Sequence, residues 1–129
     1  MIAIDTNVLV RFLVNDDAEQ FTRAKALVNE NAIFVPTTVL LESEWVLRDV
    51  YGFTKSRIVE ALGRFLDLDA VTAENAGAAR NALAWAGKGM DFADALHLAC
   101  ANPCRAFASF DLKLARRAVK VGATTVVAP

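Results

Sequence analysis

Four acidic residues stand where their carboxylates could act together. Each one ends an apolar run or opens a helical pattern, and the four are Asp5, Glu42, Asp94 and Asp111. Clustered carboxylates repel one another and raise each other's pKa unless a cation neutralises them. A site that offers oxygen ligands, and too few histidines or cysteines to bind zinc, favours Mg²⁺ or Mn²⁺ over Zn²⁺. One or two such ions could activate a water molecule for in-line attack on a phosphodiester.

Alternating strands and helices would bring these acids to one place. Short apolar and β-branched runs predict strands at residues 2–4, 32–35, 66–71, 105–110 and 124–127. Apolar spacing and capping residues predict helices at 18–31, from 37 or 38 to about 51, at 54–65, 72–85, 94–101 and 112–121, with a turn or helix at 8–13.

This order predicts an α/β fold, a three-layer α/β/α sandwich around a mostly parallel central sheet of four to five strands. In such a sheet the carboxyl ends of the strands and the starts of the following helices face one crevice. We therefore expect Asp5, Glu42, Asp94 and Asp111 to share a site there.

Length and composition set the remaining limits. The chain has 129 residues, which predicts a single domain over 1–129. Apolar residues make up 55% of the chain, which suggests a surface buried in a dimer or against a partner, but no run is long enough to predict a membrane span. The first residues lack a basic leader, so a cytoplasmic protein is expected. Cys100 and Cys104 fit neither redox nor zinc spacing and are predicted to be free, buried thiols.

The net charge of −1 means that a polyanion would need a local basic patch. One candidate directly follows Asp111, because basic residues recur at positions i, i+3, i+4 and i+7 of the predicted helix. These residues are Lys113, Arg116, Arg117 and Lys120. These residues either form a solvated helix face or contact the phosphates of a nucleic acid. Arg11 could also contact a phosphate.

Four motifs resemble those of PIN-domain ribonucleases, and among these the VapC-type toxins of bacterial toxin–antitoxin pairs. They are Ile4-Asp5-Thr6-Asn7-Val8-Leu9-Val10, Leu41-Glu42-Ser43-Glu44-Trp45-Val46-Leu47, Asp91-Phe92-Ala93-Asp94-Ala95-Leu96 and Ser109-Phe110-Asp111. The resemblance covers essentially the whole chain. It implies a PIN-like fold, metal-dependent endonucleolytic cleavage of RNA, a homodimer and inhibition by a cognate antitoxin.

The resemblance also assigns roles to the four acids. It implies that Asp5 and Asp94 are the central metal ligands, and that Glu42 and Asp111 hold the ion or a bound water from outside. Mg²⁺ is the expected cofactor, with Mn²⁺ as the alternative.

Each candidate also has a structural interpretation. Asp5, Asp91 and Asp111 could cap the helices that they precede. Glu42 and Glu44 lie two residues apart, so only one of them can face the crevice. The family motif favours Glu42, which leaves Glu44 as a surface or interface charge.

Neighbouring polar residues could assist the acids. Asn7 could orient Asp5, and Ser109 could bind a ligand or water. His97, the only histidine, lies one turn after Asp94, yet we interpret it as a packed or hydrogen-bonded helix residue rather than a general base. Metal-bound water does not need a histidine to reach a useful pKa.

Five aromatic residues are predicted to lie mostly in the core, although the helix pair around residues 45–65 is aromatic enough to supply a dimer interface. These residues are Trp45, Tyr51, Phe53, Phe65 and Trp85.

Two other functions fit an acid after the first strand. A phosphoacceptor receiver module would need paired acids there and an acceptor aspartate near mid-chain, whereas this chain offers a single Asp5 and a helical Glu42. A phosphatase with an aspartate nucleophile would need a second acid where Asn7 stands. The sequence leaves open which RNA is cut and which antitoxin binds.

Overall fold

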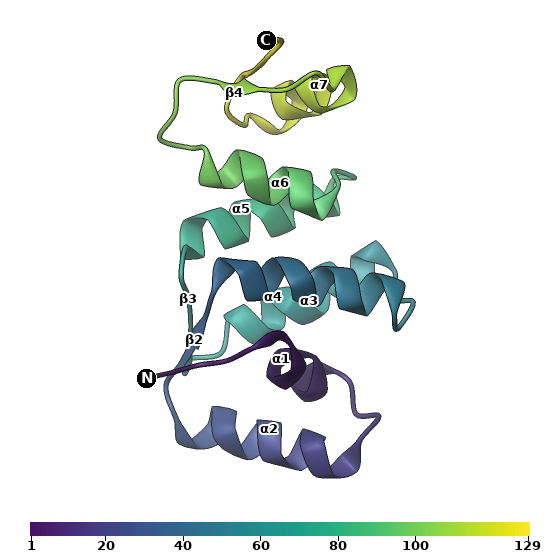
Figure 1. Cartoon of the computed structure of the whole chain (residues 1–129), viewed down its shortest axis with the longest axis vertical. Helices are drawn as coiled ribbons and strands as arrows, with labels where there is room; N and C mark the ends of the chain where they lie inside the picture. Colours follow the sequence, from purple (N-terminus) through teal and green to yellow (C-terminus); the bar gives the residue numbers. More distant parts are fainter. The chain divides into compact units, whose positions relative to one another are not determined.

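The computed structural model describes residues 1–129 and contains seven helices and five short strands. The chain divides into two compact units, Met1–Ala76 and Gly77–Pro129. Each unit combines helices with a parallel sheet of its own (Figure 1). None of the helices is both long enough and apolar enough to cross a membrane.

The first unit is built on a three-stranded parallel sheet in the order β1-β2-β3. Its strands are β1 (Ile2–Ala3), β2 (Ile33–Val35) and β3 (Val71–Ala73), and its helices are α1 (Thr6–Leu13), α2 (Ala18–Glu30), α3 (Thr37–Asp49) and α4 (Lys55–Leu66). Ile33 lies opposite Ile2 on one side and Val71 on the other, which sets the register. Helix α1 contacts both α2 and α3 (Figure 1).

The core of the first unit is aliphatic with one aromatic pair. Leu9, Leu47 and Leu62 are inaccessible to solvent. The ring of Phe65 meets that of Phe12 edge to face, with centroids 5.1 Å apart, the arrangement that aromatic quadrupoles prefer. This packing holds α1, which follows Asp5, against α4.

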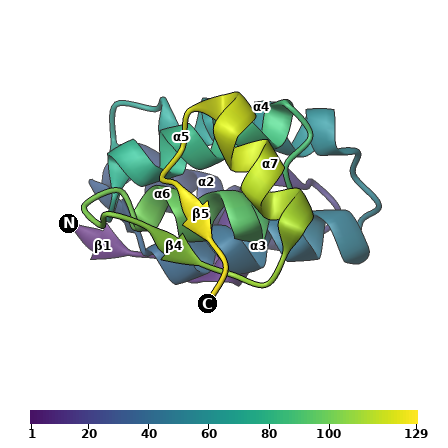
Figure 2. The ribbon, with the colours of Figure 1, turned by 90° about the horizontal axis from the view of Figure 1, so that it is seen from above.

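The second unit comprises α5 (Ala76–Gly87), α6 (Phe92–Cys100), β4 (Phe107–Ala108), α7 (Leu112–Val121) and β5 (Val126–Val127). Strands β4 and β5 pair in parallel, with Phe107 opposite Val126, and α7 contacts β5 (Figure 2). Small side chains dominate its core, where Ala82, Ala95 and Leu98 are inaccessible to solvent. Gly122 ends α7 in the left-handed conformation, with φ of 70°, which glycine adopts without a steric penalty.

The predicted α/β class and the parallel pairing are confirmed. The structure has five strands, but they pair as one three-stranded and one two-stranded sheet, where the sequence predicted a single sheet of four to five strands. The strand predicted at residues 66–71 is wrong, because Leu66 is the last residue of α4 and the strand begins at Val71. The alternating residues between them form a turn, in which the N–H of Leu68 donates to the carbonyl of Phe65.

Three further predictions also need correction. Trp45 was predicted to be mostly buried, but it is 50% exposed near the end of α3. Cys100 and Cys104 are free, as predicted, but both are exposed because they lie at and beyond the end of α6. The helix predicted to begin at Thr72 begins at Ala76, since Thr72 belongs to β3.

Candidate active site

Asp5 combines a capping role with exposure to solvent. It follows β1 and is the N-cap of α1, where its Oδ1 accepts the N–H of Val8 at 3.1 Å. The structural interpretation of Asp5 as a cap is therefore correct. A cap uses one carboxylate oxygen, and the side chain is exposed, so Oδ2 stays available for chemistry. Asn7 is exposed in the first turn of α1.

Thr6 connects the segment of Asp5 to Glu42. The Thr6 hydroxyl is buried and donates a short hydrogen bond to Oε1 of Glu42, 36 residues further along the chain. A hydrogen bond to a charged acceptor is stronger than one between neutral groups. It fixes the position of an otherwise exposed glutamate on α3 beside the start of α1.

Glu44 was predicted to be a surface or interface charge, but within this chain it is not at the surface. It is only 7% exposed, and its Oε2 accepts from Nε of Arg48 at 3.0 Å. Arg48, one turn along α3, compensates the buried carboxylate, which would otherwise be costly to desolvate. Glu42 and Glu44 do lie on different sides of α3, as their spacing predicted.

Asp91 and Asp94 form a local acidic pair in the second unit. Asp91 is the N-cap of α6, and its Oδ2 accepts the N–H of Asp94 at 3.1 Å. Asp94 itself lies in the first turn of α6 and is half-buried. This geometry supports the capping interpretation of Asp91.

The pKa of Asp94 is raised above its ordinary value of 3.8. Partial burial is the main cause, and the negative charges of Asp91 and Asp111 add to it, while His97 and Arg117 act in the opposite direction. Charges interact this way only at short range in a solvated protein. Within the second unit, the charges of Asp91 and Asp111 thus act on the carboxylate of Asp94.

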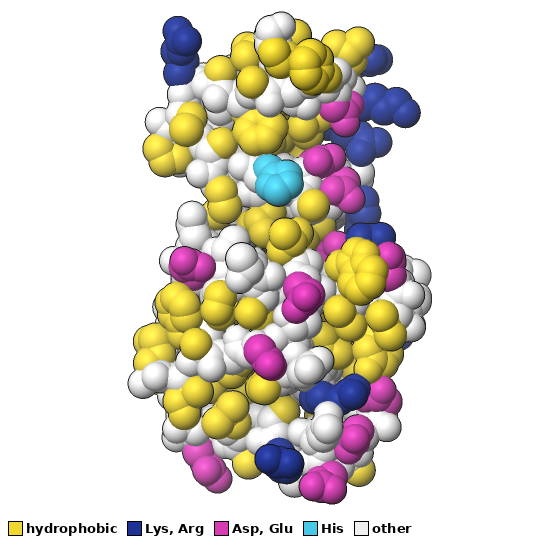
Figure 3. Space-filling view, in the orientation of Figure 1, with side chains coloured by type: hydrophobic (Ala, Val, Ile, Leu, Met, Phe, Trp, Pro, Cys, Tyr) yellow, Lys and Arg dark blue, Asp and Glu magenta, His cyan; other side chains and the backbone are white.

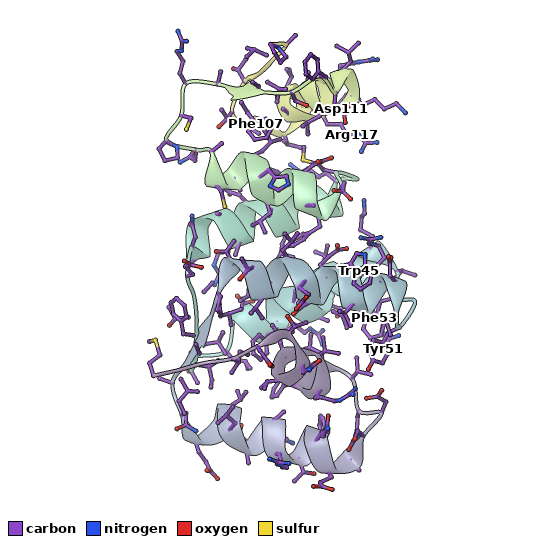
Figure 4. The ribbon with its side chains drawn as sticks, viewed as in Figure 1. Trp45, Tyr51, Phe53, Phe107, Asp111 and Arg117 are labelled. Carbon is purple, nitrogen blue, oxygen red and sulfur yellow. The ribbon has the colours of Figure 1, made fainter.

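Asp111 is held by hydrogen bonds on both sides. Its Oδ1 accepts the N–H groups of Lys113 and Leu114 at 2.9 and 3.1 Å, which makes it the N-cap of α7. Its own N–H donates to Oγ of Ser109 at 3.0 Å. Ser109 thus positions the backbone of Asp111, and Figure 4 shows Asp111 at the start of the helix that also carries Arg117.

Arg117 is a positive charge that acts on the acidic residues of the second unit. The sequence identified it only as part of a basic helix face. Its Nη1 donates to the carbonyl of Gly89 at 3.2 Å, and its charge lowers the pKa of Asp94. The i, i+4 spacing from Lys113 was its only sequence signal. Figure 3 shows Lys and Arg side chains next to acidic ones in the second unit, and places the one histidine, His97, at the surface.

The first unit holds a cavity of about 420 Å³ between α1 and α2, lined in part by Asn7, Arg11 and Arg23. Arg11 is already engaged, because its Nη1 donates to the Tyr51 hydroxyl at 2.7 Å and lies 3.1 Å from Oδ1 of Asp16. These partners raise the pKa of Arg11. Its role here is to tie α1 to the end of α3.

The donor chemistry of the predicted residues suits a hard divalent cation, because every side chain offers carboxylate oxygens. Asp5 and Glu42 belong to the first unit, and Asp94 and Asp111 to the second. No group of three or more histidine, cysteine, aspartate or glutamate side chains is arranged to hold a metal ion. The crowding that raises the pKa of Asp94 is the kind that a bound cation relieves.

Comparison with known proteins identifies the class. The sequence matches the PIN domain over residues 2–120, so the match includes residues of both units. Comparison with curated proteins and with solved structures found no match. The chain therefore belongs to the PIN domain family, whose members are usually nucleases.

The bond between Thr6 and Glu42 leads to a stability prediction. Replacing Thr6→Val keeps the side-chain volume but removes the hydroxyl donor, so we expect the free energy of unfolding to fall by about 1 kcal/mol. Urea unfolding measures this free energy. The matched control is Thr38→Val, because Thr38 is an exposed threonine of α3. In a Glu42→Ala background, which lacks the acceptor, the cost of Thr6→Val should shrink, and an unchanged cost would show that the bond does not hold Glu42.

The raised pKa of Asp94 leads to a pH prediction. Because the folded protein binds this proton more tightly than the unfolded chain, the contribution of Asp94 to stability is present below pH 3.8 and is lost as the pH rises through the raised pKa. Asp94→Asn removes that loss. We expect its melting temperature at pH 7 in chelator to exceed that of the wild type by about 1–2 °C, with a smaller gain near pH 4.

Thermal unfolding of both proteins across this range measures the difference, and Asp69→Asn, in the exposed turn after α4, serves as the control. A gain that stays constant with pH would mean that the charge of Asp94 is not the cause.

Proposed function

We propose that this PIN domain is a divalent-metal-dependent endoribonuclease and the toxin of a toxin–antitoxin pair. The observation that carries the proposal is the carboxylate group of the second unit, in which partial burial, and then the charges of Asp91 and Asp111, raise the pKa of Asp94. Uncompensated acids cost stability, and their retention at helix starts favours a role in binding a cation. The family match supports a hydrolase that cuts nucleic acid.

In the proposed mechanism Asp5 and Asp94 are the main ligands of Mg²⁺ or Mn²⁺, and Glu42 and Asp111 hold the ion or a bound water. A bound divalent ion would polarise the phosphodiester. It would also lower the pKa of a water bound to it toward neutral pH. The Thr6 hydroxyl keeps Glu42 oriented by donating to its Oε1. The capping bonds of Asp5 and Asp111 restrict their side-chain rotation, so the remaining oxygens are pre-oriented.

The toxin role and the partners are parts of the same proposal. Inhibition by a cognate antitoxin would be supported by a small antitoxin-like reading frame next to this one. A homodimer is supported by the exposed apolar surface at the end of α3, where Trp45 and Val50 are exposed beside Tyr51 and Phe53 (Figure 4). A sedimentation mass of one 14.0 kDa chain would remove the dimer from the proposal.

The receiver and phosphatase alternatives have no support in the structure. Asp5 already uses one oxygen as a helix cap, and the position two residues later is an exposed asparagine, Asn7. The family match also favours a nuclease over either alternative.

The test is cleavage of bulk cellular RNA with Mg²⁺, with EDTA, and with the variants Asp5→Asn and Asp94→Asn. We expect EDTA and each substitution to lower the cleavage rate more than about 100-fold. Asparagine caps a helix as well as aspartate does, so Asp5→Asn removes charge without unfolding α1.

Asp17→Asn is the matched control, because Asp17 caps α2 by accepting the N–H of Gln20 at 3.0 Å and is not among the candidate acids. It should cleave like the wild type. Cleavage that survives EDTA and both substitutions would overturn the proposal.

A further inference from the structure

Phe110 presents an aromatic ring to solvent immediately before Asp111. It is 85% exposed, the highest value among the exposed large apolar residues of the chain. A hydrophobic residue one position before an N-cap often packs on the fourth helical residue, which in α7 is Ala115. At this exposure Phe110 does not make that contact. The start of α7 therefore gives no structural reason for a phenylalanine here.

The backbone on both sides of Phe110 is held in place. The N–H of Ser109 donates to the carbonyl of Val127 at 3.0 Å, and Oγ of Ser109 accepts the N–H of Asp111. Asp111 is in turn fixed as the N-cap of α7. The ring thus projects from a fixed support, so a ligand that stacked on it would order little additional backbone.

Helix α7, which begins two residues after Phe110, carries an exposed basic face. Its four cations are exposed, recur at i, i+3, i+4 and i+7, and take part in no salt bridge; they are Lys113, Arg116, Arg117 and Lys120. The opposite face buries Leu114 and Ala118. The exposed Leu112 and Val119 lie seven residues apart on a third side, so they do not interrupt the basic face.

We propose that Phe110 stacks on a base of single-stranded RNA while the basic face of α7 binds the adjacent phosphates. The inference rests on the proposed nuclease function and adds a substrate-binding contact to it. An exposed aromatic ring beside a row of cations is the arrangement by which proteins bind single strands without reading sequence. A duplex offers no free base face, so this contact selects single strands over duplexes.

The charge of the face favours a polyanion over an apolar protein surface. Four exposed cations that form no salt bridge complement the phosphates of a nucleic acid, whereas an apolar protein surface would desolvate them without supplying an opposite charge. The ring also directly precedes Asp111, one of the acids of the proposed reaction.

The experiment measures binding rather than cleavage. Fluorescence anisotropy in EDTA measures the Kd of the full-length wild type for three fluorescein-labelled ligands. These are octa-adenylate, an oligonucleotide of the same length with abasic sites, and an RNA duplex. The variants are Phe110→Leu, which keeps an apolar side chain without a π face, Phe110→Trp, and the control Val119→Ser, which alters an exposed apolar residue outside the basic face.

We expect Phe110→Leu to weaken binding of octa-adenylate about 5- to 100-fold, Phe110→Trp to preserve it, and Val119→Ser to leave it unchanged. Binding of the abasic chain and of the duplex should be insensitive to Phe110. Equal affinity of Phe110→Leu and the wild type for octa-adenylate would overturn the inference. So would a change in sedimentation mass with Phe110→Leu at unaltered affinity, which would assign the ring to an interface between copies of the chain.

The two proposals fail separately. RNA cleavage by the wild type together with Phe110-independent binding would reject the stacking contact and retain the nuclease. If binding depends on Phe110 but the protein cuts no RNA, the nuclease proposal is rejected and the stacking contact is retained.

Discussion

The capping of helix N-termini by aspartates is the interaction on which this structure and its proposed chemistry both depend. Asp5, Asp91 and Asp111 each accept a backbone N–H at the start of α1, α6 and α7. Such a cap contributes about 1 kcal/mol and places the carboxylate at the positive end of a helix. Structural and functional interpretations of these acids are therefore compatible, since one oxygen serves the helix and the other remains for a ligand.

The same arrangement has a cost at Asp94, which is the half-buried member of the acidic group in the second unit. Burial and the charges of Asp91 and Asp111 disfavour its ionised form, and Arg117, anchored on the carbonyl of Gly89, offsets only part of this effect. Proteins keep such strained charges where function needs them. A PIN domain that binds a divalent cation here would recover the lost stability on binding.

Sequence patterns predicted what depends on local spacing. The bounds of α7, the caps at Asp5 and Asp111 and the parallel α/β class follow from short-range periodicity and capping chemistry. The patterns could not show the hydrogen bond from Thr6 to Glu42 or the exposure of Trp45, because both depend on how distant segments pack. The alternation at residues 66–71 was misleading, since a turn after α4 also alternates apolar and acidic residues.

The proposed function assigns Asp5 and Asp94 to one reaction, and the double variant of Asp5→Asn and Asp94→Asn tests this assignment most directly. Residues that act as a unit lose their effect together, so the RNA cleavage rate of the double variant should equal that of the more impaired single variant. Independent contributions would multiply instead. A double variant whose rate falls by the product of the two single losses would contradict the assignment.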